Sequence, residues 1–200
     1  MGRSEKMYAR VRRNLKGMEQ VTATEIYESL QLAQQDIILR FNGLTKDIEV
    51  TTVEDQVAYT LQDNIRSIKS IVKPTGDAWY RTTKYVMPKN WEEISRIEIS
   101  GEPLYWMFND NMTELKLHPA PTTDDEIITL QCYMKNSTTE IGDGVEPEIE
   151  DYWDTCMVYY ATSEYLDPQY WLGRYENRVQ EIKHVAQQST LEAKVKKANW

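Results

Sequence analysis

Carboxylates gather in one short segment, and their spacing comes nearest to a recognisable chemistry. The run Gly-Asp-Gly-Val-Glu-Pro-Glu carries Asp143, Glu146 and Glu148. A calcium-binding loop of the EF-hand type places oxygen ligands at its first, third and fifth positions, a glycine at the sixth and a glutamate at the twelfth. The run lacks that spacing. It is therefore interpreted as a solvated acidic loop that leads into a helix.

Nucleophiles and soft metal ligands are scarce. Cys132 and Cys156 fall on apolar faces of an expected strand and an expected helix, which favours buried reduced thiols. No C-x-x-C pair and no Cys/His set at zinc spacing is present, and His118 and His184 have no partners at ligand spacing. The eight glycines are spread through the chain and form no phosphate-binding loop. The sequence therefore predicts that the protein is not an enzyme and holds no metal or cofactor.

Aromatic residues are the compositional anomaly, with thirteen tyrosines and six tryptophans. Tyr105, Trp106 and Phe108 crowd into GEPLYWMFNDNMTELKLHPAP, residues 101–121, which reads as two strands around an Asn-Asp-Asn turn. In a strand Trp106 and Phe108 share one side and Tyr105 points to the other. These aromatics fit a domain core, and the side left over fits an interface with another chain. Stacking on sugars is a further use of such residues.

Charge divides the chain into an acidic body and two basic ends. Residues 1–20 carry a balance of +4 and residues 186–200 a balance of +2, so the total of −9 leaves −15 for residues 21–185. Basic ends fit acidic partners, whereas the body is expected to repel nucleic acid. No apolar run is long enough for a membrane span, and the N-terminal stretch lacks the apolar core of a signal peptide. We expect a protein that is made in a cytoplasm.

The first strong element is a helix over residues 22–41. Thr22 and Glu25 have the spacing of a capping box, and apolar residues then recur at steps of three and four. Asn42-Gly43 ends the helix, with the glycine expected in the left-handed position. Residues 5–16 fit either a basic helix or a flexible arm.

From Asp47 to about Ser137 the hydrophobic period changes from 3.6 residues to two. Strands are expected at residues 57–61, 65–73, 96–99 and 126–134 and in both arms of the hairpin. In the 126–134 strand one face is apolar throughout, formed by Ile128, Leu130, Cys132 and Met134. Several short strands without intervening helices predict an antiparallel sandwich or small barrel.

Helical periodicity returns after the acidic loop. Pro147 suits the first position of a helix over 147–166, and Asp167-Pro168 begins another over 168–186. The fold class is therefore α+β, an antiparallel bundle of three main helices with an inserted antiparallel β domain. The expected division is a helical domain of residues 1–46 and 143–200 and a β domain of residues 47–142.

Four runs in this order resemble the head-to-tail adaptors of tailed bacteriophages, also called connector or ring proteins, which include the tail tubular protein A type. The runs are LQLAQQDIILRFN, VAYTLQDNIRSIKSI, GEPLYWMFNDNMTELKLHPAP and VEPEIEDYWDTCMVYYATSEYL. The resemblance covers about residues 26–186, and it departs at Gln62, where the family often has proline.

The resemblance implies a structural role in the virion, at the neck or tail, after assembly in the host cytoplasm. Family members form rings, commonly of twelve subunits, beneath the portal protein, and the tail tube or nozzle attaches below. DNA passes through the channel without specific binding, and no membrane is involved. The leftover aromatic surface of the hairpin then becomes an intersubunit or tail interface, assigned to Tyr105, Trp106 and Phe108.

Portal docking is assigned to the basic C-terminal segment, residues 187–200. Its short apolar stripe and its lysines favour a tail that orders on a partner, with a terminal aromatic anchor. The docking residues are Leu191, Lys194, Val195, Lys196, Lys197 and Trp200. Two other interpretations stay open: a carbohydrate-binding β module of a tail or cell-surface protein, and a capsid or tail-completion monomer that forms no ring.

Overall fold

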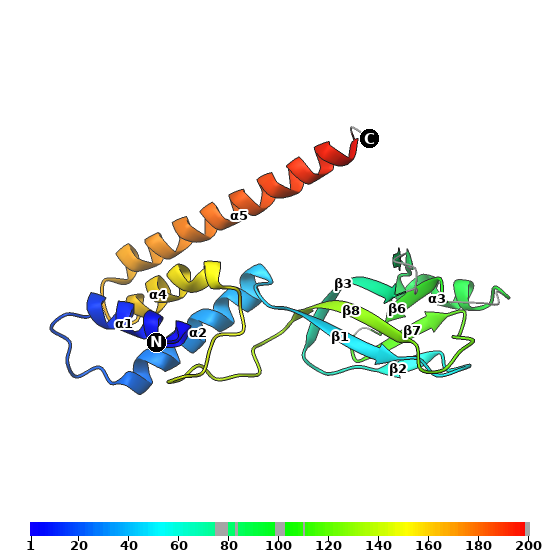
Figure 1. Cartoon of the computed structure of the whole chain (residues 1–200), viewed down its shortest axis with the longest axis horizontal. Coiled ribbons are helices and arrows are strands. Elements are labelled where there is room, and N and C mark those ends of the chain that lie inside the picture. Colours follow the sequence, from blue (N-terminus) through cyan, green and yellow to red (C-terminus); the bar gives the residue numbers. More distant parts are fainter. Residues whose placement is uncertain (75–79, 83, 99–102, 110, 199–200) are drawn as a thin grey trace. The chain divides into compact units, whose positions relative to one another are not determined.

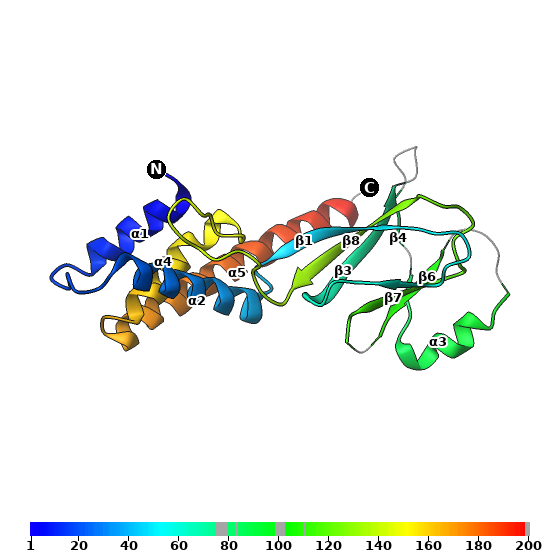
Figure 2. The same cartoon turned by 90° about the horizontal axis from the view of Figure 1, so that it is seen from below.

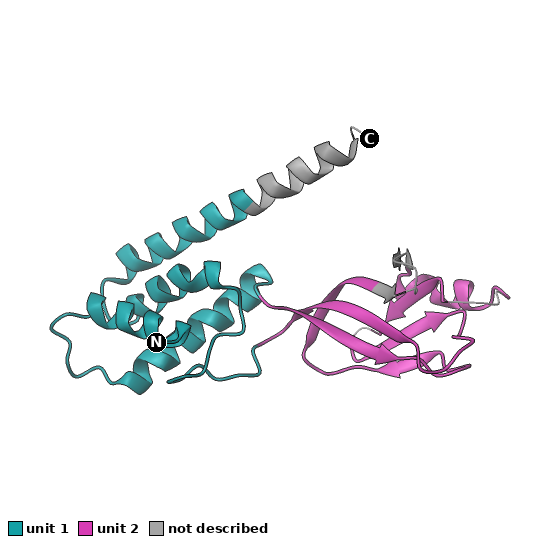
Figure 3. Ribbon diagram, viewed as in Figure 1, with its two compact units in different colours: residues 1–43, 137–200 teal, residues 44–136 magenta. Residues whose placement is uncertain are grey.

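The computed structural model describes the backbone of residues 1–74, 80–82, 84–98, 103–109 and 111–198, and the side chains of this set outside 72–84 and 186–198. The chain forms two compact units, shown in different colours in Figure 3. The helical unit comprises residues 1–43 and 137–200, and the β unit comprises residues 44–136. Residues 137–142, which the sequence-based division assigned to the β domain, belong to the helical unit.

Four α-helices and one short 3-10 helix are described in the helical unit (Figure 1). The helix at the N-terminus, for which a flexible arm was the alternative, is formed. Together with the three helices expected from the sequence it makes four α-helices, so the predicted bundle of three main helices is incomplete. The elements are α1 (Arg3–Asn14), α2 (Ala23–Phe41), η1 (Asp151–Trp153), α4 (Asp154–Ser163) and α5 (Pro168–Ala198).

The start of α2 has the predicted capping box. At its end, the residue in the left-handed conformation is not the one that was predicted. The Thr22 Oγ1 accepts a hydrogen bond from the Glu25 amide at 3.3 Å, and the Glu25 carboxylate accepts one from the Thr22 amide at 2.6 Å. Asn42, not Gly43, takes the left-handed conformation, with φ of 53°. Asparagine tolerates this region better than other non-glycine residues, which explains why it can replace the expected glycine.

The C-terminal helices are confirmed with shifted bounds. The helix expected from Pro147 begins later, because residues 147–150 are not helical and lead into η1 and α4. The Asp167 Oδ1 accepts a hydrogen bond from the Gln169 amide at 3.1 Å and caps α5 as expected. This helix continues past residue 186 to Ala198. Extending an existing helix costs little, and Leu, Ala, Glu and Lys in this segment are strong helix formers.

Helix α4 packs against α1, α2 and α5 (Figures 1 and 2). Trp153 of η1 and Met157 and Ala161 of α4 are buried in this unit. On α5, Tyr175 and Val179 are fully buried, and the Tyr175 hydroxyl donates a hydrogen bond to the Asp36 carboxylate of α2. Burial and this bond raise the pKa of Tyr175 well above its ordinary value.

The β unit contains two open sheets, each with three antiparallel strands and one short edge strand. One sheet has the order β1-β8-β3-β4 and the other β2-β7-β6-β5, in which β5 and β6 are parallel. The expected small barrel is therefore wrong, and a sandwich of the two sheets stays a prediction. The strands are β1 (Thr45–Thr51), β2 (Ala58–Thr60), β3 (Ile65–Pro74), β4 (Tyr80–Thr82), β5 (Lys84–Tyr85), β6 (Tyr105–Phe108), β7 (Glu114–His118) and β8 (Ile127–Met134).

The apolar face predicted for the last strand is confirmed. Ile128, Leu130, Cys132 and Met134 are all buried, and β8 pairs with β1 on one side and with β3 on the other. The hairpin is also confirmed, because Asn109 accepts hydrogen bonds from the amides of Thr113 and Glu114 at 2.9 and 3.1 Å and closes the turn.

The strand expected at residues 96–99 is wrong for residues 96–98, and Ile99 lies outside the described residues. The structure has helix α3 (Pro88–Ser95) just before it, followed by a turn. Pro88 occupies the first helical position, where a missing amide proton costs nothing. Ile97 alternates with charged residues, a pattern typical of a strand. The helix α3 gave no strong apolar stripe in the sequence, because none of its described residues is buried.

Candidate interaction surfaces

Trp106 and Phe108 of the hairpin are buried and Tyr105 is partly exposed, although Met107, on the Tyr105 side of the strand, is buried as well. Trp106 is 7% exposed and Phe108 is 2% exposed, and their rings meet with centroids 5.1 Å apart. These two side chains belong to the core of the β unit and offer no surface to a neighbour or platform to a sugar. Tyr105 is partly exposed, and Tyr85 covers Trp106 with centroids 4.7 Å apart. The interface assignment of Tyr105 stays a prediction.

The C-terminal docking residues lie mostly beyond the described side chains. The backbone of Leu191, Lys194, Val195, Lys196 and Lys197 belongs to α5, whereas their side chains are outside the described set. Leu191 and Val195 are four residues apart in this helix and so lie on one face. The backbone of the last expected anchor, Trp200, is also outside the described residues.

Helix α1 is anchored to the segment that precedes α4. The Arg3 guanidinium contacts the Asp154 carboxylate at 2.6 Å and donates a hydrogen bond to the Ile149 carbonyl, also at 2.6 Å. The Glu146 carboxylate accepts hydrogen bonds from the amides of Arg3 and Ser4, each at 2.9 Å. A carboxylate at this end complements the helix dipole. Glu146, part of the calcium-like run, therefore serves as a cap.

Arg10, Arg13 and Arg174 line a cavity of about 210 Å³ where α1, α4 and α5 meet, together with the aromatic side chains of Tyr159 and Trp171. We call this the arginine–aromatic pocket. It is lined by Arg10, Arg13, Asn14, Val158, Tyr159, Trp171 and Arg174. Arg10 and Arg13 are three residues apart on α1, which places them on one face of that helix.

Arg174 is held by aromatic groups instead of by a carboxylate. Its guanidinium donates hydrogen bonds to the hydroxyls of Tyr170 and Tyr159, at 3.1 and 3.2 Å. It also lies 4.7 Å from the ring centroid of Tyr159 and 5.6 Å from that of Trp171, within cation–π range. The hydrogen bond to Tyr170 is the main cause that raises the pKa of Arg174. Arg174 is thus fixed in place as a full positive charge.

A larger groove of about 820 Å³ runs beside the N-terminal half of α2. We call it the α2 groove. Its other wall is the 140–143 segment, which α2 holds through an amide: the Gln31 Oε1 accepts a hydrogen bond from the Ile141 amide at 3.0 Å. Leu32 is 55% exposed at this groove, although it is a large apolar residue. The lining residues are Ala23, Thr24, Tyr27, Glu28, Gln31, Leu32, Glu140, Ile141, Gly142 and Asp143.

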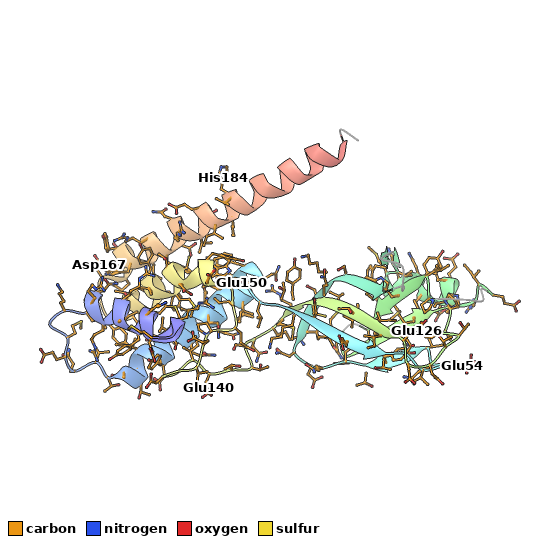
Figure 4. All side chains as sticks on the ribbon, in the orientation of Figure 1. Glu54, Glu126, Glu140, Glu150, Asp167 and His184 are labelled. Carbon is orange, nitrogen blue, oxygen red and sulfur yellow. The ribbon has the colours of Figure 1, made fainter. Side chains whose placement is uncertain are left out.

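The charges at the α2 groove are all negative. Glu28, Glu140 (labelled in Figure 4) and Asp143 line it without a lysine or arginine. Burial and the nearby Asp143 carboxylate raise the pKa of Tyr27, which stacks on Tyr8 of α1 with centroids 5.3 Å apart. The groove therefore combines an exposed apolar side chain with a negative potential.

The described part of the chain contains no metal-binding cluster and no activated cysteine. No group of three or more His, Cys, Asp or Glu side chains there could hold a metal ion. Both cysteines are fully buried, and burial raises the pKa of each thiol to about 12, so neither is an activated nucleophile. No described helix has the length and apolarity that a membrane crossing requires. What the molecule offers instead is surface for contacts with other chains.

The comparison with protein families agrees with this reading. A family described as SU10 adaptor protein matches residues 6–195. The chain belongs to this family of phage head-to-tail adaptors. A search of curated proteins gives no match. The family match includes residues of both the helical unit and the β unit of the adaptor.

Sequence reasoning missed both charged surfaces of this adaptor. The arginine–aromatic pocket draws Arg10 and Arg13 from a segment interpreted as a basic end, and Arg174 from a helix more than 150 residues away. The α2 groove depends on a loop interpreted as solvated. The available signals were the three-residue spacing of the two arginines and the position of Leu32 off the buried stripe of α2.

Proposed function

We propose that the protein forms a ring beneath the portal of a phage and joins the portal to the tail tube or nozzle. The membership in a phage adaptor family over residues 6–195 carries this proposal.

DNA passes through the centre of such a ring without specific binding. The body, residues 21–185, has a balance of −15, so a channel lined by it would repel the phosphates of the cargo. Each subunit contacts two neighbours through two different surfaces, as any closed ring requires. We propose twelve copies.

The portal contact is made by the C-terminal segment, residues 187–200. It is basic, with Lys194, Lys196 and Lys197 against Glu192, and it would be attracted by an acidic rim on the portal. The terminal Trp200 fills an apolar pocket, which is the usual role of an aromatic anchor.

Deletion of residues 187–200 tests the portal contact. We expect a nearly unchanged thermal midpoint and a complete loss of portal binding, measured by co-purification with the portal of the same phage and by electron microscopy of the complex. Trp200→Ala should weaken binding more than any single lysine substitution. A truncated protein that binds the portal with full affinity contradicts this role, and a two-fold dimer on the portal contradicts the ring.

A further inference from the structure

The helical unit carries two surfaces that are complementary in charge. Three arginines and no carboxylate line the arginine–aromatic pocket. Three carboxylates and no lysine or arginine line the α2 groove. None of these six groups forms an ion pair within the part of the chain that the structure describes. Both surfaces therefore keep their charge available for another molecule.

The two surfaces lie on different faces of the helical unit. Tyr8 of α1 stacks on Tyr27 of the α2 groove. At about 100° per residue, Arg10 and Arg13 lie roughly 200° and 140° around α1 from Tyr8. One subunit can thus use both surfaces at the same time.

An apolar group is left uncovered within the α2 groove, and another directly beside the arginine–aromatic pocket. Tyr170, which holds Arg174, is 54% exposed, and Leu32 of the groove is 55% exposed. A contact between the surfaces covers these side chains while it pairs the charges. Desolvated apolar contacts supply affinity, and charge complementarity supplies register and orientation.

We propose that the arginine–aromatic pocket of one copy binds the α2 groove of a second copy. Arg13 and Arg174 of the first copy face Glu28 and Asp143 of the next. The two surfaces differ, so the contact is heterologous and each copy keeps one surface for a further neighbour. This inference rests on the proposed ring and names the surfaces that close it.

Charge reversal tests the contact. The pocket-reversed variant carries Arg13→Glu and Arg174→Glu, and the groove-reversed variant carries Glu28→Lys and Asp143→Lys. Rings are counted by mass photometry and electron microscopy, alone and on the portal of the same phage. Each variant by itself places like charges against each other, and we expect at least about a tenfold loss of rings.

Mixing the two variants provides the decisive step. In an equimolar mixture every contact of an alternating ring again joins opposite charges, and rings should return to near the wild-type count. Matched controls reverse exposed charges elsewhere: Lys89→Glu with Arg96→Glu, and Glu150→Lys with Glu164→Lys. These should leave the ring count unchanged, and recovery in the mixture shows that the reversed variants are folded.

The outcomes separate this inference from the proposed function. If the wild-type protein forms no ring alone or on the portal, the proposed function fails and the inference fails with it. If wild-type rings form and the reversed variants assemble equally well, or the mixture does not recover, the inference alone is overturned. Loss of portal binding with intact rings assigns the pocket to the portal and also overturns it.

Discussion

The two units of the molecule differ in the interactions that stabilise each of them internally. In the helical unit, side chains join segments that are far apart in sequence, as in the Arg3–Asp154 pair and the Tyr175–Asp36 hydrogen bond. In the β unit, the backbone of β8 pairs with both β1 and β3, and alternate apolar residues fill the core. The β unit is thus specified by pattern and pairing, whereas the helical unit depends on particular side chains. Both charged surfaces, the arginine–aromatic pocket and the α2 groove, belong to the helical unit.

The largest expected effect is on the rate at which a thiol reagent labels the two buried cysteines, one in each unit. Cys156→Ala leaves Cys132 to report on the β unit, and Cys132→Ala leaves Cys156 to report on the helical unit. Since both thiols are fully buried, labelling by a thiol reagent should be at least about 10³-fold slower than in urea. Different rates for the two variants would show that the units open independently. A rate equal to that in urea contradicts the burial.

The same thiols predict a pH dependence. Burial raises the pKa of each from 9.0 to about 12, so the folded protein keeps protons that the unfolded chain releases. The free energy of unfolding should be unaffected by these thiols below about pH 9 and should fall as the pH rises from 9 toward 12. Urea titrations at pH 8 and pH 10 measure this, and a variant without either cysteine should lose the corresponding part of the decrease.

Leu130→Ala should strongly destabilise the β unit. Leu130 is fully buried on the central strand β8, and its truncation leaves a cavity that costs about 3 kcal/mol. Ile127→Ala on the same strand is the control, because Ile127 is 44% exposed and should cost less than about 1 kcal/mol. Urea unfolding followed by circular dichroism measures both. Equal losses in the two variants would mean that β8 is not the centre of this core.

Arg3→Ala should have an intermediate effect in the helical unit. It removes a partly buried ion pair with Asp154 and a hydrogen bond to the Ile149 carbonyl, at a cost of about 1–3 kcal/mol. The control is Arg96→Ala in the β unit, whose pair with Glu92 is exposed and should contribute less than about 1 kcal/mol. The free energy of unfolding and amide exchange in α1 are the measurements. Unchanged exchange in α1 would contradict the anchoring role.

Thr22→Ala should have the smallest effect, a loss of about 1 kcal/mol from the α2 cap. The bond from the Thr22 amide, which the substitution keeps, and the bond from its hydroxyl lower the pKa of Glu25. Only the part of the cap that uses the Glu25 carboxylate is therefore present above the ordinary pKa of 4.5 and lost as the pH falls through the folded value. Thr24→Ala, which makes no cap, is the control. Thermal midpoints at pH 7 and pH 3 measure the difference, which should be smaller at the lower pH but not vanish, because the bond from the Glu25 amide to the Thr22 Oγ1 contains no titratable group.

Local pattern alone predicted much of this fold. The box of Thr22 and Glu25, the alternation along β8 and the Asx turn at Asn109 each act within a few residues, so spacing reveals them. Errors arose where two local interpretations compete. Ile97 alternates with charged residues like a strand, although the proline-initiated α3 comes just before it. Trp106 and Phe108 could be core or interface by sequence, and the packing of the β unit buries them.

The sequence by itself determined the order of the elements, the change of period from helix to strand and back, and the adaptor resemblance, which the family match confirms. Only the tertiary structure decided that α1 is docked, since the Arg3 and Asp154 that fix it are 151 residues apart. It likewise gathered Arg10, Arg13 and Arg174 around one cavity. Helical periodicity shows which face of a helix is buried, but not which helix lies against it. Long-range side-chain contacts make that choice, and they have no signature in local spacing.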